Sequence, residues 1–127
     1  MIVFIIELAS AVICMESGTC GDPVRLQVIR KNFNTFLGNC RGIRLLGSVS
    51  INMCYVAAGI VDSYVDFGIH AWDMAAGDMI IKEAGGVVVD TTGGKFDVLN
   101  RRLVAASSDQ LAQEISARLV HIDLERD

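Results

Sequence analysis

The sequence has no excess of positive charge, since 11 lysines and arginines stand against 15 aspartates and glutamates among 127 residues, for a net charge of −4. Proteins that bind nucleic acid or an anionic membrane normally carry a basic patch. Apolar residues make up 52% of the chain and charged residues 20%, a balance that excludes intrinsic disorder. We therefore expect a folded domain with no nucleic-acid partner and no membrane partner, which would need a metal ion to handle a phosphate group.

The sequence also lacks a hydrophobic run long enough for a membrane span. Its first 15 residues, MIVFIIELASAVICM, are mostly apolar but are interrupted by Glu7, and a spanning helix needs about 20 apolar residues. A signal peptide begins with a basic segment, whereas the first basic residue here is Arg25. We interpret residues 2–6 as a buried strand of a parallel sheet. A core strand so near the start indicates a missing upstream segment.

Several site motifs are absent. The cysteines, Cys14, Cys20, Cys40 and Cys54, form no C-x-x-C pair, which argues against structural zinc, and their spacing does not resemble a disulfide framework. We expect free thiols in a reducing compartment and a cytoplasmic location. G-x-G-x-x-G, Walker A, G-x-S-x-G and H-E-x-x-H motifs are also missing, which counts against an α/β nucleotide-binding module.

Hydrophobic periodicity predicts alternating helices and strands. Helices are expected over residues 24–37, 49–58, 73–84 and 111–119, and strands over residues 2–6, 43–46, 60–67, 87–89 and 103–106. Ser48 and Gly59 are the expected caps of the second helix, and Ser107 with Gln110 has the spacing of a capping box before the last. This alternation predicts one α/β domain over residues 1–127, with a mixed or mostly parallel sheet flanked by helices.

Ligands of such sheets bind beyond the carboxyl ends of strands, beside helix N-termini. Two strand-to-helix junctions meet this description. At Gly47-Ser48-Val49, the glycine allows close approach of a ligand. At the second junction, Asp66 and Asp73 could face one cleft, and carboxylate oxygens are ligands that Mg²⁺ prefers. Taken locally, both junctions also have a structural interpretation, with Ser48 and Asp73 as helix N-caps and Asp66 as a solvated strand end.

Longer motifs point to a family. The segment from WDMAAG (residues 72–77) to EAGG (residues 83–86) closely resembles the C-terminal signature of the inositol monophosphatase family. Further motifs resemble that family in order: GIR with GS (42–44, 47–48), NMC (52–54), GIH (68–70), DTTGG (90–94) and VAAS (104–107). The resemblance is strong over residues 41–127, includes a family-like strand at residues 2–8, and is weak over residues 9–40.

The resemblance implies the C-terminal half of the inositol monophosphatase-like sugar-phosphatase fold. It also implies a lithium-sensitive phosphatase that uses Mg²⁺ to hydrolyse inositol monophosphate, and a homodimer for the complete enzyme. Asp73 matches a metal ligand of the family. Asp66 falls where the family usually has a glutamate that binds inositol hydroxyls, and Gly47, Ser48 and Val49 fall beside the substrate. The shorter Asp66 side chain puts sugar selectivity in question.

The family's first metal motif, D-P-[IL]-D-G-T, and its water-activating residue are missing. Residues 22–27, DPVRLQ, begin like that motif and then diverge. We therefore expect no complete catalytic set in this chain and no activity from the chain alone. An open alternative is a non-catalytic fragment that pairs with a full-length phosphatase subunit. Loss of an upstream domain would also leave an apolar face uncovered, so we expect self-association or a partner.

Overall fold

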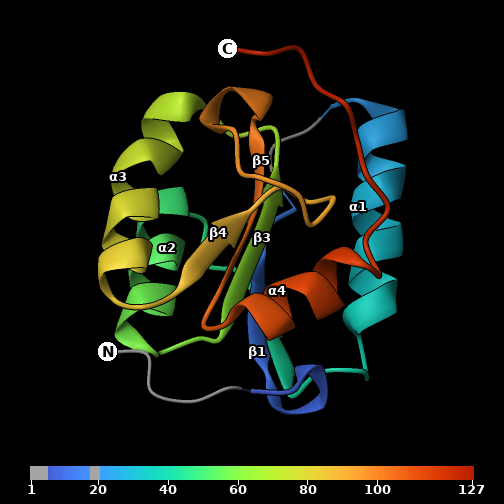
Figure 1. The fold of residues 1–127 in the computed structure, drawn as a ribbon. Coiled ribbons are helices and arrows are strands. Elements are labelled where there is room, and N and C mark those ends of the chain that lie inside the picture. The colour runs from blue at the N-terminus through green and yellow to red at the C-terminus, as the bar shows by residue number, and fades with distance from the viewer. Residues whose placement is uncertain (1–5, 18–20) are drawn as a thin grey trace.

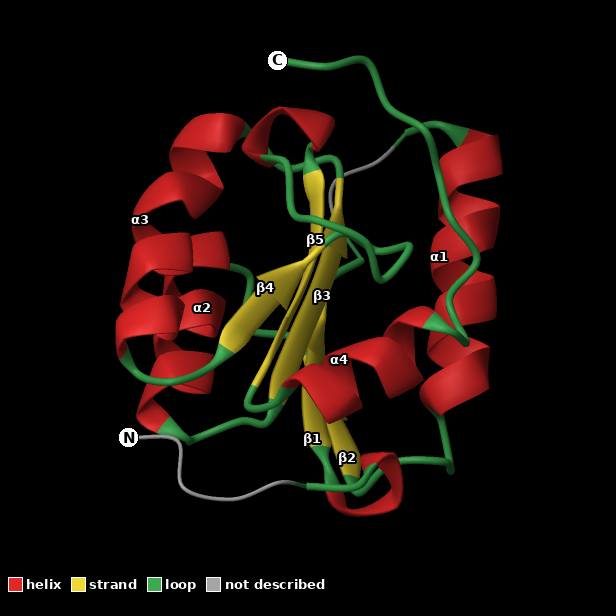
Figure 2. Ribbon diagram, in the orientation of Figure 1, coloured by secondary structure: helices red, strands yellow, loops and turns green. Residues whose placement is uncertain are grey.

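The computed structural model describes residues 6–17 and 21–127, which form a five-stranded sheet between two layers of helices (Figures 1 and 2). The strands are β1 (Val12–Met15), β2 (Gly42–Arg44), β3 (Ser63–Phe67), β4 (Val87–Val89) and β5 (Arg102–Ala106). Their order is β2-β1-β3-β5-β4. The first three run parallel, whereas β5 is antiparallel to both β3 and β4. The expected mixed α/β sheet is confirmed.

Two helices cover each face of the sheet. The helices are α1 (Pro23–Phe36), α2 (Val49–Ala58), α3 (Ala71–Glu83) and α4 (Asp109–Ser116), with short 3₁₀ turns at Leu8–Ser10 and Val98–Asn100. Figure 2 shows α2 and α3 packed together on one side and α1 and α4 on the other. No helix in the described part of the chain is both long and apolar enough to cross a membrane.

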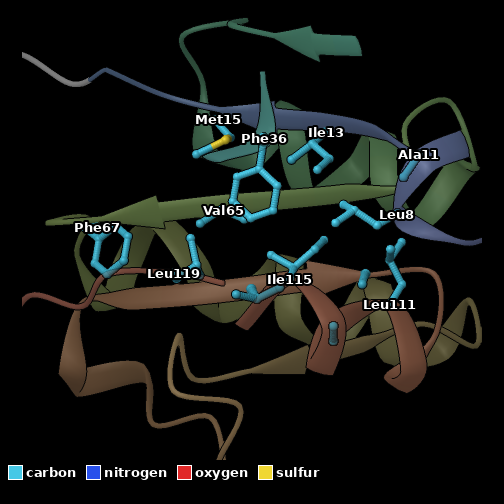
Figure 3. Close-up of a cluster of buried hydrophobic side chains, with 13 residues drawn as sticks. Leu8, Ala11, Ile13, Met15, Phe36, Val65, Phe67, Leu111, Ile115 and Leu119 are labelled. Atoms are coloured by element: carbon cyan, nitrogen blue, oxygen red, sulfur yellow. The ribbon is translucent and has the colours of Figure 1, made fainter. Parts of the chain in front are cut away.

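The sheet separates two hydrophobic clusters. Under α1 and α4, Ile13 and Val65 pack against Phe36 and Ile115 (Figure 3). Under α2 and α3, the second cluster includes Tyr64. All five residues of β3 are buried, because this central strand has a helical layer on each face, as is typical of strands in α/β sheets.

The first described strand, β1, lies outside the residue range in which the sequence pattern predicted a strand. Residues 2–5 are outside the described part of the chain, Ile6 and Glu7 are irregular, and Leu8 begins a 3₁₀ turn. Instead, Val12–Met15 pairs with β2 on one side and β3 on the other. The apolar run is longer than one strand, so tertiary pairing selects which part of it enters the sheet.

Two helices begin at other residues than the sequence pattern predicted. The third helix begins at Ala71 rather than at residue 73, and Asp73 sits in its first turn, where its Oδ2 accepts the His70 N–H at 3.0 Å. The last helix is capped by Ser108 and not by Ser107, and it ends at Ser116. In contrast, Ser48 and a left-handed Gly59 cap α2 as predicted.

Candidate functional site

A cleft of about 450 Å³ opens where β1 and β3 end and where α2 and α3 begin. The two parallel strands meet there at their carboxyl ends, which is the usual ligand position in α/β sheets. The predicted residues Gly47, Ser48, Val49, Asp66 and Asp73 all line this cleft. The structure thus brings both junctions together. It adds six lining residues that sequence reading had not selected: Glu16, Ser17, Arg25, Phe67, Gly68 and Ile69.

At the first junction, Gly47 has a φ of +77°, a left-handed conformation that favours glycine. No atom lies within 4 Å of the position that a Cβ would occupy, so the backbone is open to an approaching molecule. Ser48 is a true N-cap, because its Oγ accepts the Ile51 N–H at 3.3 Å. Ser48 is therefore the N-cap that its local sequence predicted, and it also lines the cleft.

Glu16 organises this junction from the other side of the cleft. Its Oε1 accepts the N–H groups of Leu46 at 2.9 Å and Gly47 at 3.0 Å, together with Asn52 Nδ2 at 2.9 Å. The carboxylate thus joins the end of β1 to the loop that leads into α2. The sequence analysis did not select Glu16, because it predicted no strand directly before this residue; the carboxylate follows β1, whose position only the structure gives.

Asp66 is a buried carboxyl and not a solvated strand end. It lies within β3, is 8% exposed, and accepts the Tyr64 hydroxyl at 2.5 Å and the Phe67 N–H at 2.8 Å. Burial raises the pKa of Asp66 from 3.8 to about 6, although both hydrogen bonds oppose the rise, and the Glu16 charge adds to it. Burial also raises the pKa of Tyr64, which keeps its hydroxyl protonated as the donor.

The raised pKa of Asp66 predicts a pH-dependent stability. The folded chain holds this proton more tightly than the unfolded chain, so the contribution is present near pH 4 and lost as pH rises through about 6. The shift corresponds to about 3 kcal/mol. In urea unfolding between pH 4 and pH 7, wild type should lose stability relative to Asp66→Asn. Asp109→Asn, at the exposed start of α4, should follow wild type, and parallel curves for wild type and Asp66→Asn would refute the assignment.

Arg25 brings the positive charge of the cleft. Its Nη2 donates to the Phe67 carbonyl at 2.6 Å, and a Cβ at residue 68 would overlap the guanidinium, so Gly68 makes room for it. Of the charged residues that line the cleft in the described chain, Arg25 is the cation, and Glu16, Asp66 and Asp73 are acidic. Sequence reading missed Arg25 because it lies in the segment without family motifs.

Asp73 is the candidate metal ligand. Its Oδ2 accepts a hydrogen bond from the His70 N–H. The half-buried side chain lines the cleft at the start of α3. A single carboxylate fits Mg²⁺, which usually takes one or two carboxylates with waters and substrate phosphate. Within residues 6–17 and 21–127, however, no group of three His, Cys, Asp or Glu side chains is placed to hold a metal ion. Within the described chain, Asp73 therefore stands as a candidate ligand without two further such side chains grouped beside it.

The C-terminal tail supports the start of α3. It runs along α1, where Asn32 and Val120 exchange two hydrogen bonds (Figure 1). Asp127 then accepts the Ala71 N–H at 2.8 Å and contacts His70 Nδ1 at 2.8 Å. The His70 ring is stacked on Trp72 with centroids 4.5 Å apart. These contacts fix the loop that carries Asp73 into the cleft.

Comparison with known proteins identifies the family. Rat inositol monophosphatase 2 is 41% identical over 122 residues, which cover 95% of this chain and 42% of that protein. Bovine inositol monophosphatase 1 is 40% identical over 124 residues, which cover 95% and 44%. The crystal structure of the extragenic suppressor protein suhB from Bartonella henselae superposes with a TM-score of 0.79 at 25% identity, covering 87% of this chain and 42% of that chain.

The chain spans less than half the length of the curated relatives it matches. The model of the inositol monophosphatase family matches residues 10–124. This span includes nearly all of the 9–40 segment in which motif reading found little resemblance, so the relationship extends across α1 and β1 as well. On these grounds, the chain belongs to the inositol monophosphatase family.

Proposed function

We propose that this chain is the part of a Mg²⁺-dependent inositol-phosphate phosphatase that carries one metal ligand and the residues beside the leaving group. The observation that carries this proposal is the single cleft that gathers Asp73, Asp66 and Gly47 from two separate junctions. The proposed reaction is hydrolysis of inositol monophosphate to inositol and phosphate. Lithium inhibition and a homodimer of the complete enzyme belong to the same proposal, as does a cytoplasmic location, which free Cys14 and Cys40 support.

In the proposed mechanism, Asp73 would hold the ion at the start of α3, where the helix dipole also favours an anionic group. Bound Mg²⁺ supplies Lewis-acid stabilisation of charge on the phosphate and leaving oxygens. Asp66 faces the same cleft and, above its pKa of about 6, accepts hydrogen bonds from polyol hydroxyls. Arg25 holds the end of β3 through the Phe67 carbonyl, which positions the backbone between Asp66 and Asp73.

The test is a family-length chimera, in which this chain replaces the matched part of rat inositol monophosphatase 2. With Mg²⁺, the chimera should release phosphate from inositol 1-phosphate. Asp73→Asn should lower kcat/KM by about 100-fold or more, because one carboxylate is lost from the metal. Glu83→Gln, an exposed position at the end of the same helix, is the matched control and should leave the rate unchanged. Full activity of Asp73→Asn, or no hydrolysis by the unmodified chimera, would refute the proposal.

A second candidate is a non-catalytic chain that pairs with a full-length phosphatase subunit. It is supported by the lack, among the described residues, of three His, Cys, Asp or Glu side chains grouped to hold a metal ion. In this case, adding the chain to a full-length family enzyme would change the enzyme's sedimentation, and Asp73→Asn would make no difference. Dependence of phosphate release by the chimera on Asp73 would favour the first candidate.

A further inference from the structure

Strand β3 places two polar side chains on the same face of the sheet. Val65 and Phe67 lie in the cluster under α1 and α4 (Figure 3). Because side chains alternate along a strand, Tyr64 and Asp66 point to the opposite face. Tyr64 is fully buried in the cluster under α2 and α3, whereas Asp66 lines the cleft. The phenol ring therefore lies below the cleft, two residues before the carboxylate.

The Tyr64 hydroxyl and one backbone amide fix the Asp66 carboxylate. Tyr64 Oη donates to Asp66 Oδ2 at 2.5 Å, and the Phe67 N–H donates to Asp66 Oδ1 at 2.8 Å. With one donor on each oxygen, the plane of the carboxylate is set. A carboxylate has about four acceptor positions, so about two remain for donors that enter the cleft.

The same hydroxyl is connected to the first junction through Asn52. This residue is fully buried on α2, and its Nδ2 donates to Glu16 Oε1 at 2.9 Å. Burial raises the pKa of Tyr64 and the Asp66 charge adds to the rise, whereas the Asn52 side chain opposes it, as an amide donor beside the phenol oxygen does. Polar contacts thus run beneath the cleft from Asp66 to Glu16, and such connected contacts hold each member in one orientation.

We propose that Tyr64 is a positioning residue for polyol recognition, whose hydroxyl holds the Asp66 carboxylate with its remaining acceptor positions toward the hydroxyl groups of a ligand. This inference rests on the proposed function, in which Asp66 accepts hydrogen bonds from the polyol. Tyr64 is not among the described residues that line the cleft, so it acts through Asp66. A carboxylate that is already held loses little conformational freedom when a ligand binds, which favours affinity.

The first test follows Asp66 in the isolated chain, residues 1–127, by carboxyl ¹³C NMR across a pH titration. Tyr64→Phe keeps the buried ring and removes a hydrogen bond that lowers the Asp66 pKa. The pKa of Asp66 should therefore rise by about one pH unit. The charged groups that face Asp66 from other elements are unchanged in this variant: Glu16 after β1, Arg25 on α1 and Asp73 on α3. An unchanged Asp66 pKa would overturn the proposal.

Tyr55→Phe is the matched control. Tyr55 lies on α2 and is 37% exposed, and this variant loses the same hydroxyl group. It should leave the Asp66 pKa as in wild type. Wild type also gives a readout that needs no substitution, because a buried and hydrogen-bonded Tyr64 hydroxyl proton should exchange slowly enough with water to give an NMR signal. The absence of this signal would also count against the proposal.

The second test compares two phosphate esters in the family-length chimera with Mg²⁺. One is inositol 1-phosphate, and the other is p-nitrophenyl phosphate, whose leaving group has no polyol hydroxyls. Tyr64→Phe should raise KM for inositol 1-phosphate and lower kcat/KM by about tenfold, with no change for p-nitrophenyl phosphate. In an Asp66→Ala background, Tyr64→Phe should have no further effect on inositol 1-phosphate, because it acts through Asp66. Equal losses on both esters would show a structural role alone and overturn the proposal.

This inference and the proposed function fail in different ways. If the chimera is inactive, or if Asp66→Ala keeps the wild-type preference for inositol 1-phosphate, the function proposed for Asp66 is refuted, and the role of Tyr64 in polyol recognition falls with it. If Asp66→Ala loses that preference while Tyr64→Phe keeps it, the proposed function stands and Tyr64 is not a positioning residue.

Discussion

The purified chain, residues 1–127, is expected to hydrolyse inositol 1-phosphate in the presence of Mg²⁺ at a rate close to the uncatalysed background. Asp73 is one carboxylate, and the described residues hold no cluster of three metal-binding side chains. The loss of even one electrostatic element of an active site can lower kcat by about 10²–10³, and this sequence does not contain the D-P-[IL]-D-G-T motif that the family resemblance leads us to expect as a further metal site.

Phosphate release should be followed for the isolated chain and for the family-length chimera at the same protein and Mg²⁺ concentrations. The chimera serves as the positive control, because it restores the length of a family enzyme around the same cleft. Robust turnover by the isolated chain, inhibited by lithium, would contradict this prediction. It would mean that residues of this chain replace the missing ligands, and the cleft-lining Glu16 and Asp66 would be the first to substitute.

Gly77→Val should strongly destabilise the packing of α2 against α3. The space beside Gly77 is already filled, because a Cβ would lie 2.5 Å from Met53 Sδ and 2.8 Å from Met53 Cβ. Met53 is fully buried and has no free volume to move into, since protein cores are close-packed. The two helices must therefore separate, which we expect to lower the free energy of unfolding by about 3 kcal/mol.

Ala76→Val is the matched control for this substitution. It introduces the same β-branched side chain into the neighbouring position of α3, which is exposed, so it carries the same helix-propensity cost without the clash. Urea unfolding of both variants measures the difference directly. If Gly77→Val and Ala76→Val unfolded at the same urea concentration, the close contact between α2 and α3 would be disproved.

The charged side chains of the cleft decide how it would bind a phosphate group. The cleft is lined by three acidic residues and one guanidinium, so these charges by themselves disfavour a phosphate monoester. A bound cation reverses this balance, and Asp73 is the acidic residue that lies at a helix N-terminus where an anion would also be favoured. Asp66 is set deeper, and burial raises its pKa to about 6, so the charge of this chain's cleft changes near that pH.

Short-range sequence patterns predicted α2 and β4 correctly, because residues next to these elements fix where they begin and end. Helix α2 begins after Ser48 and ends before Gly59, as predicted, because a hydroxyl cap and a left-handed glycine act within one turn. The strand Val87–Val89 was also predicted with its observed bounds, since the preceding glycines end α3 and the run of valines favours a strand. The position of β1 was missed, because an apolar run contains no periodicity that selects Val12–Met15.

The sequence by itself determined the family, the alternation of helices and strands, and the choice of two strand-to-helix junctions, one at Gly47 and one from Asp66 to Asp73, as candidate ligand positions. All of these follow from short-range patterns or from motifs that keep their order. Only the tertiary structure decided that Glu16 and Arg25 reach the same cleft, because they depend on which strand lies beside β3 and where α1 docks. It also decided that α2 and α3 are buried on one side alone, since apolar composition predicts burial but pairing between distant segments chooses the face.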